Sequence, residues 1–261
     1  MPNTLTERLV DDAGLFPPTS LDMGDALARN ARDRAAGAPM LTNRFLVTSG
    51  DLPGLLTTLP AGQEIELGLI HSGDADSLSE ALGQARQLVR HVELKGLDGW
   101  DGVPDDLPVY VEAVPRAELP EAIEVVRLAN RSAPTGVKVR CGGVTADLFP
   151  SVEELASALR AIVNAGVPMK ATAGLHSAVR NTNPQTGFDH HGFVNLLVAI
   201  DTALQDGDVV SALAERDPDK LAQRARGISD ERAARVRDVL VSYGSCSTSS
   251  PVQQARELQL L

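Results

Sequence analysis

The sequence predicts an α/β fold: a single (β/α)8 TIM barrel over residues 1–261, with a helical insertion at 177–240 between the seventh and eighth strands. Eight short segments rich in Val, Leu and Ile alternate with helical patterns, which favours a parallel sheet. A chain of 261 residues suits eight such units. A doubly wound open sheet is the alternative, although no Gly-x-Gly-x-x-Gly dinucleotide motif follows the first strand.

The first half of the chain carries four of the predicted strands. They are expected at 9–16, 44–48, 64–70 and 91–96. Helices are expected between them at 22–36, 49–59 and 77–89. Pro17 and Pro18 end the first strand, and Asp22 is a candidate N-cap. The connection at 97–106 is close to the shortest parallel crossover, so we expect no full helix there.

The second half supplies the other four strands and the insertion. Strands are expected at 108–114, 136–143, 167–176 and 240–247. Helices are expected at 119–130, 151–165, 192–204, 209–215, 217–226, 229–240 and 251–261. Glu153 and Glu154 suit the first turn of one helix, and Ser250 is a candidate cap of the last. Within the polar stretch 181–191, the segment 181–188 is either a mobile lid or a solvated surface loop.

Charged residues recur on one face of several predicted strands. Side chains alternate faces along a strand, so Lys138 and Arg140 lie opposite the apolar face of theirs. A barrel strand turns its apolar face to the helices, which sends the charged face inward. The predicted interior charges are Glu66, Glu93, Lys95, Glu112, Lys138, Arg140 and Lys170. Four cations against three carboxylates leave a positive surplus that suits a phosphate or carboxylate ligand.

Two alternatives to that interpretation stay open. The charges could form a salt-bridge network that only replaces apolar layers, although such networks seldom stabilise more than hydrophobic packing does. If the sheet is open, with helices on both faces, the inward assignment fails.

Two lysines on consecutive units indicate amine chemistry. A partly desolvated lysine beside another cation has a lowered pKa and can form a Schiff base. Lys138 and Lys170 are the candidates, one as the nucleophile and the other as the group that lowers its pKa. Glu112 or Glu93 could transfer protons, and Lys95 completes the catalytic candidates.

The segments Val137–Gly143 and Met169–Gly174 resemble strands six and seven of the deoxyribose-phosphate aldolase group of class I aldolases. The resemblance implies that Lys138 forms the Schiff base and that Lys170 tunes it. Arg140 departs from that family, which has a small polar residue there.

Other parts of the sequence depart from that family. Glu93 or Lys95 occupies the position of the family's acid on strand four. The segments 11–18 and 243–247 are instead similar to a bacterial family without an assigned function, and that likeness transfers no chemistry.

Polar residues at the predicted strand ends are candidates for substrate binding. They are Asp12, Arg140, Thr172, Gly174, His176, Ser245, Cys246 and Ser247. The turn at 244–251 leads into a helix N-terminus, where N–H groups and hydroxyls either bind an anion or form a plain helix cap. Cys246 is either a nucleophile favoured by that helix or a small buried filler.

Metal and cofactor chemistry have little support in the sequence. The possible metal ligands are His176, His190, His191 and Asp189. Their spacing matches neither HxxxH nor HExxH, so we expect no metal and no cofactor. His176 then serves better as a substrate contact or proton shuttle.

Composition limits the partners. A net charge of −11 argues against nucleic acid, and no apolar run is long enough to span a bilayer. The N-terminus lacks a signal-peptide pattern, and the two cysteines would stay reduced, so we expect a cytoplasmic protein. The expected partner is a small anionic substrate, and a homo-oligomer stays open.

The resulting hypothesis is a lyase of the aldolase type. It would act on a small phosphorylated or carboxylated carbonyl compound through a lysine Schiff base. One alternative is an isomerase or epimerase with an anion clamp and a Glu acid/base. The other is a barrel without catalysis that serves as a binding protein.

Overall fold

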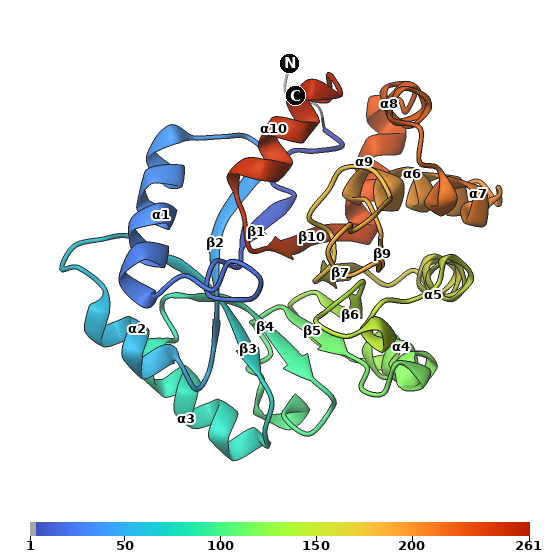
Figure 1. Cartoon of the computed structure of the whole chain (residues 1–261). Coiled ribbons are helices and arrows are strands. Elements are labelled where there is room, and N and C mark those ends of the chain that lie inside the picture. The colour runs from blue at the N-terminus through green and yellow to red at the C-terminus, as the bar shows by residue number, and fades with distance from the viewer. Residues whose placement is uncertain (1–3) are drawn as a thin grey trace.

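The computed structural model describes residues 4–261 and has a closed barrel of parallel strands at its centre (Figure 1). The strand order around the barrel is β1-β10-β7-β6-β5-β4-β3-β2. Because β1 pairs with both β2 and β10, the sheet has no edge, and the open-sheet alternative is wrong. The predicted (β/α)8 barrel is confirmed.

The barrel strands are short, and each runs parallel to its neighbours. They are β1 (Val10–Asp12), β2 (Leu41–Thr48), β3 (Glu66–His71), β4 (Val89–Lys95), β5 (Val109–Glu112), β6 (Thr135–Arg140), β7 (Met169–Thr172) and β10 (Leu240–Ser245). The first strand is much shorter than predicted. After Asp12 the chain turns away, and the N–H of Phe16 bonds to the carbonyl of Ala13 at 3.0 Å.

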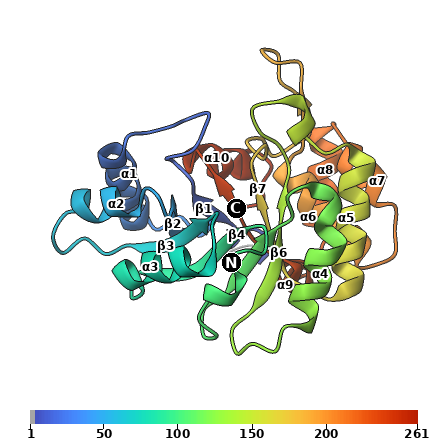
Figure 2. The same ribbon diagram turned by 90° about the horizontal axis from the view of Figure 1, so that it is seen from below.

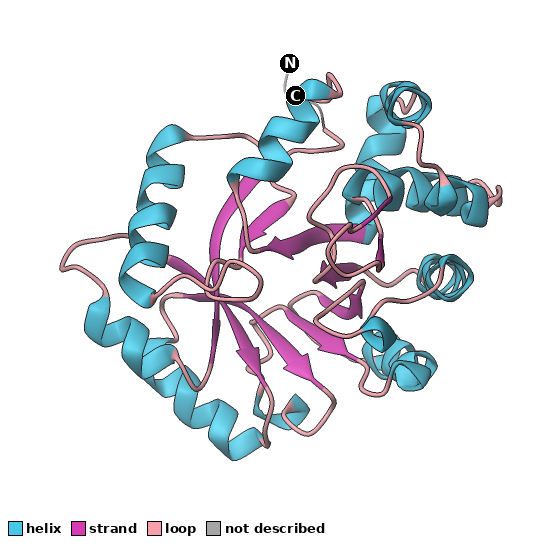
Figure 3. Ribbon diagram, in the orientation of Figure 1, coloured by secondary structure: helices cyan, strands magenta, loops and turns pink. Residues whose placement is uncertain are grey.

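Helices surround the strands on the outside (Figures 2 and 3). They are α1 (Met23–Ala36), α2 (Leu52–Thr58), α3 (Ala75–Ala85), α4 (Leu119–Leu128), α5 (Val152–Ala165), α6 (Phe193–Ala203), α7 (Val209–Ala214), α8 (Pro218–Arg226), α9 (Asp230–Val239) and α10 (Ser249–Glu257). Single 3-10 turns occur at Trp100–Gly102, Arg116–Glu118 and Ala146–Leu148. The first of these is the only helical turn between β4 and β5, as predicted. None of the described helices is long and apolar enough to cross a membrane.

The insertion between β7 and β10 holds α6 to α9, as predicted, and also a small hairpin. Its strands are β8 (Asn181–Thr182) and β9 (Asp189–His190), which pair antiparallel. The hairpin includes residues 181–188, for which the sequence allowed either a mobile lid or a solvated surface loop. Phe188 and His190 pack on Phe149 with ring centroids 5.5 and 4.7 Å away, so the hairpin is anchored to the loop after β6.

Helix ends follow the capping signals in the sequence. Asp22 caps α1 by accepting the N–H of Asp25, as predicted. Ser151 and Glu154 form a reciprocal capping box at the start of α5. The predicted cap of the last helix is wrong, because α10 already begins at Ser249. The N–H of Ser250 donates to Ser247 Oγ at 3.2 Å instead.

The main apolar core lies between the barrel and its helices. Val92, Val109, Val137 and Met169 are fully buried on the outward faces of their strands. This layer is almost entirely aliphatic, as the 3% aromatic content requires. The inward faces of the strands can therefore carry polar and charged side chains.

The capping box gives a stability prediction. Ser151→Ala removes the acceptor for the N–H of Glu154, so the free energy of unfolding should fall by about 1 kcal/mol. Urea denaturation measures this change. The matched control is Ser79→Ala, because Ser79 lies inside α3 and caps nothing. Equal effects of the two substitutions would contradict the capping assignment.

Candidate active site

Charged side chains of neighbouring strands lie level with one another at the C-terminal part of the barrel. Lys95 pairs in register with Glu112, Glu112 with Lys138, and Lys138 with Lys170. Residues that pair in register on adjacent parallel strands point to the same side of the sheet. The register therefore forms a layer of charged side chains on one face of β4, β5, β6 and β7, in which Glu112 lies between Lys95 and Lys138 and the two lysines of β6 and β7 are neighbours.

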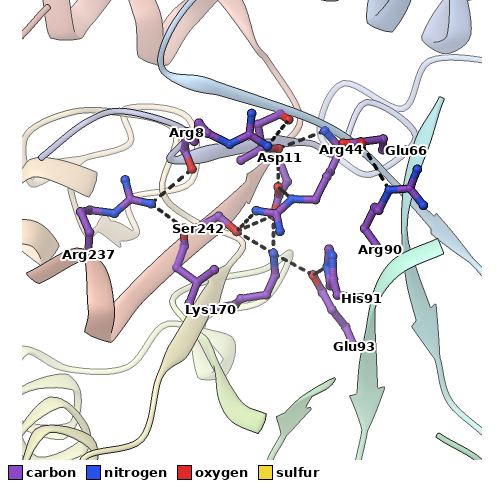
Figure 4. A network of polar contacts seen from close by, with 12 residues as sticks. Arg8, Asp11, Arg44, Glu66, Arg90, His91, Glu93, Lys170, Arg237 and Ser242 are labelled. Atoms are coloured by element: carbon purple, nitrogen blue, oxygen red, sulfur yellow. Dashed lines mark hydrogen bonds and ion pairs between the residues drawn. The ribbon is translucent and has the colours of Figure 1, made fainter. Parts of the chain in front are cut away.

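Lys170 lies deepest in this layer and is 1% exposed. Its Nζ forms an ion pair with Asp11 of β1 and a 2.7 Å hydrogen bond to Ser242 Oγ of β10. Glu93 Oε1 of β4 lies 3.3 Å from the same nitrogen (Figure 4). Contacts to β1 and β4 are reached only across the barrel interior. The predicted inward orientation of Lys170 is thus confirmed.

Lys138 is the second buried lysine, at 4% exposure. Its Nζ lies 2.9 Å from Glu93 Oε2 and 2.9 Å from Glu112 Oε2. The other oxygen of Glu112 accepts the Nε–H of Arg140 at 2.7 Å. Glu93 therefore binds one lysine through each of its oxygens and joins the two ammonium groups.

The ion pairs connect into one chain of alternating sign through the barrel. Its members in order are Arg44, Asp11, Lys170, Glu93, Lys138, Glu112 and Arg140. Four cations face three carboxylates in this chain. The predicted positive surplus is therefore present, although two of the members differ from the expected ones.

Glu66 and Lys95 were expected inside the barrel, and the structure places them outside the chain of ion pairs. Glu66 begins β3 and pairs with Arg90 at 3.2 Å, with both side chains partly exposed. Lys95 ends β4 and is exposed. Both lie on the predicted face. Strand alternation decides the face, whereas the height along the barrel axis decides whether water reaches the side chain.

Asp11 and Arg44 take their places, and the set of interior charges expected from the sequence contains neither. Asp11 is fully buried and accepts hydrogen bonds from Thr42 Oγ1 at 2.6 Å and Arg44 Nε at 2.9 Å. Its neighbour Asp12 was predicted to bind substrate, but it points outward and pairs with Arg29 of α1. A strand of three residues is too short for alternation to decide which aspartate faces inward.

The ion pairs determine which of the buried carboxyl and amino groups carry a charge. Burial works against ionisation of Asp11 and Glu93, but the adjacent lysines outweigh it and hold the pKa of both carboxyls below their usual range. Burial likewise works against the ammonium form of Lys138, yet Glu93 and Glu112 raise its pKa overall. The expectation of a lowered pKa is therefore wrong for Lys138, because two carboxylates contact it.

His91 supports Glu93 from the same strand. Its Nε2 lies 3.0 Å from Glu93 Oε1, while its Nδ1 has no partner among residues 4–261. Burial, with a further contribution from Lys170, lowers the pKa of His91 to about 4, so the ring is neutral near pH 7. A Cβ at position 68 would lie 2.4 Å from the ring, so glycine at that position makes room for His91.

A cavity of about 460 Å³ opens at the C-terminal mouth, above β4, β5 and β6. Its lining includes the charged residues Lys95, Glu112, Arg116, Lys138, Arg140 and Asp147 and the apolar residues Val114, Leu119 and Leu148. Lys138 reaches this cavity, whereas Lys170 does not line it. Lys95 forms no ion pair with any of residues 4–261, so its ammonium is free to meet a ligand.

The other substrate-binding candidates lie outside this cavity. Ser245 Oγ donates to the carbonyl of Ser247 at 2.7 Å, so its hydroxyl is used within the turn. Thr172 is half-buried at the end of β7. Gly174 has φ +72°, and a Cβ there would lie 2.6 Å from the Cys141 carbonyl, so this glycine permits close approach of two loops. A substrate-binding role for these residues stays a prediction.

The four residues considered as metal ligands have other partners. His191 contacts the Pro150 carbonyl at 2.8 Å and Arg180 at 3.1 Å. Asp189 pairs with Arg180 and Arg216. The one cluster of suitable ligand atoms within residues 4–261 consists of Asp11, His91 and Glu93. The Lys170 ammonium bonds to both carboxylates of that cluster, so a cation already balances their charge.

A scan against models of known protein families and a search of curated proteins give no match to this chain. Its function is therefore argued from the chemistry of the barrel interior.

Neutralising Glu93 should lower the free energy of unfolding more than neutralising any other single residue of the site. Glu93→Gln leaves two buried ammonium groups without their shared carboxylate, so the free energy of unfolding should fall by about 3–5 kcal/mol. The control Glu66→Gln breaks a partly exposed pair and should cost about 1 kcal/mol or less. Chemical denaturation of both variants tests this. A loss at Glu93 no larger than at Glu66 would refute the shared-carboxylate arrangement.

The lowered pKa of His91 predicts how stability depends on pH. Between pH 6.5 and about 4 the unfolded chain binds a proton at this residue and the native protein does not. Stability should therefore fall on acidification by about 1.4 kcal/mol per pH unit for this group. The measurement compares denaturation of the wild type and His91→Gln across this range. If the two proteins show the same slope, His91 is not held neutral.

Proposed function

We propose that the protein is a lyase of the aldolase type that acts through a Schiff base on Lys138. The observation that carries the proposal is the position of Lys138 Nζ. It lies in the wall of the cavity, between Glu93 and Glu112, each 2.9 Å away. Lys170 is as deeply buried but does not line the cavity, which favours Lys138 as the amine that meets a substrate.

The two carboxylates are placed to move the protons that this chemistry needs. Lys138 first gives a proton to Glu112 or Glu93, and the free amine then attacks the substrate carbonyl carbon. The carbonyl oxygen takes up protons and leaves as water, which creates an iminium ion. Glu112 or Glu93 then takes the proton of the substrate's β-hydroxyl, the iminium accepts the electrons of the breaking carbon–carbon bond, and an aldehyde leaves. Protonation of the resulting enamine, followed by addition of water, releases the second product and restores Lys138.

Lys170 acts as a positioning residue in this scheme. It places a positive charge on the oxygen of Glu93 that does not bind Lys138. That charge weakens the attraction between Glu93 and the Lys138 ammonium, which eases loss of the proton. The role agrees with the resemblance to class I aldolases, in which a second lysine tunes the first.

Unused cationic groups at the mouth support an anionic substrate. Arg140 uses its Nε for Glu112 and has one further contact, at 3.4 Å to the Gly142 carbonyl. Lys95 lies exposed on the other side of Glu112 and lines the same cavity. A carboxylate or phosphate of the substrate would fit between these two groups, with its carbonyl carbon near Lys138.

One observation favours a second candidate function. The raised pKa of Lys138 favours an ammonium group over a free amine. An isomerase or epimerase without a covalent step would use this charge, with Arg140, to hold a substrate anion. Glu112 would then transfer the proton.

Reductive trapping separates the two candidates. The protein is incubated with small carboxylated or phosphorylated aldehydes and ketones, reduced with borohydride, and digested for mass spectrometry. The expected result is an adduct on Lys138 that Lys138→Ala abolishes. Glu112→Gln should slow its formation by roughly 10²- to 10⁴-fold.

Lys95→Ala is the matched control, because Lys95 lines the same cavity without an ion pair. This variant should weaken binding of the anion and still form the adduct. Exchange of substrate protons with deuterated water in the absence of any adduct would favour the isomerase. An adduct on Lys170 alone would overturn the assignment of the nucleophile.

A further inference from the structure

A thiol and an imidazole lie together at the same end of the barrel, and the lysine chemistry uses neither. Cys246 directly follows β10, and His176 lies four residues after the end of β7. Because β10 and β7 are neighbours in the barrel, their ends bring the two side chains together. Cys246 Sγ lies 3.5 Å from His176 Nδ1.

The surroundings of Cys246 favour its thiolate. Burial works against ionisation, but interactions with His176 and Thr19 lower the pKa of the thiol overall. Helix α10 begins three residues later, at Ser249, so its positive N-terminal end is close in the chain. Reactive cysteines in proteins combine the same features, a neighbouring imidazole and a helix N-terminus.

Charged and titratable groups from α1, β1 and β9 lie near the Cys246–His176 pair. The guanidinium of Arg29 donates to the Cys246 carbonyl at 2.7 Å, and the Asp12 carboxylate neutralises it. The His190 ring lies across from His176 with centroids 6.0 Å apart. Burial and His176 lower the pKa of His190.

Cys141 provides a contrast within the same chain. It follows β6, points outward and is fully buried. Burial raises the pKa of its thiol to about 12, and the one hydrogen-bond partner of its Sγ within residues 4–261 is the Val139 carbonyl, at 3.9 Å. The sulfur of Cys246 thus has an imidazole as its partner, whereas the sulfur of Cys141 has a backbone carbonyl.

We propose that Cys246 is a nucleophilic thiolate, activated by His176, which small hydroperoxides oxidise to a sulfenic acid. The thiolate attacks one peroxide oxygen, an S–O bond forms and the O–O bond breaks. Sulfur loses two electrons, and the peroxide is reduced to water or an alcohol. The imidazolium of His176 gives its Nδ1 proton to the leaving oxygen.

The site suits a small oxidant. Cys246 is 5% exposed, and Thr19, whose side chain contacts the sulfur, is itself exposed. Hydrogen peroxide is therefore the probe of choice. The proposal does not depend on the lysine chemistry, because it uses no residue of the chain of ion pairs.

The test measures the rate at which each cysteine of the native protein is oxidised by hydrogen peroxide. Dimedone traps the sulfenic acid, and peptide mass spectrometry locates it. We expect labelling at Cys246, with Cys141 unlabelled over the same time. His176→Asn should slow oxidation at pH 7 by about tenfold, which corresponds to one unit of thiol pKa.

A second measurement is made on the wild type and so does not depend on the folding of a His176 variant. Alkylation of Cys246 by iodoacetamide should reach its plateau at a lower pH than alkylation of a free cysteine peptide. Cys141→Ser should leave both rates unchanged. The proposal would be overturned if hydrogen peroxide oxidised the two cysteines at equal rates, or if His176→Asn did not change the rate of oxidation of Cys246. It would also be overturned if alkylation of Cys246 reached its plateau at the same pH as alkylation of the free peptide.

Discussion

The carboxylate of Glu93, held between two buried ammonium groups, is the interaction on which the barrel interior depends. Burying an ion costs several kcal/mol even after relaxation, so each charge in the lumen needs a partner of opposite sign. Glu93 meets that need for Lys138 through one oxygen and for Lys170 through the other. Without Glu93, Lys138 would keep only Glu112 and Lys170 only Asp11, so the cations of the interior would face two carboxylates instead of three. The alternating order of the chain follows from this constraint.

The same constraint explains which residues surround the chain. Most barrels of this fold fill the lumen with branched apolar side chains. Here the apolar packing lies between strands and helices, and the lumen holds ion pairs and a neutral imidazole. Glycine at position 68 leaves the space that the His91 ring fills. Charged interiors seldom improve stability over apolar ones, which is one reason for proposing a catalytic role for this arrangement.

Much of this architecture could be predicted from the residues, because period-two alternation reports directly on strand faces. The inward orientation of Lys138 and Lys170 follows from the apolar residues that flank each lysine. Alternation carries no information about height along the barrel, so Lys95 was expected in the interior network and is exposed at the mouth. Asp11 was not expected among the interior charges, because β1 spans only three residues and alternation cannot decide which of its two aspartates faces inward. The raised pKa of Lys138 depends on cross-barrel contacts with Glu93, which no local pattern encodes.

Lys138 is held as a buried ammonium group between two carboxylates in the free protein. NMR of the lysine side-chain nitrogens, assigned with Lys138→Arg, reports on this state directly. We expect a slowly exchanging ammonium signal for Lys138 that titrates above the range of ordinary lysines. A Lys138 signal that exchanges with water as fast as an exposed lysine, or that titrates below the ordinary range, would show that Lys138 is not held in this way.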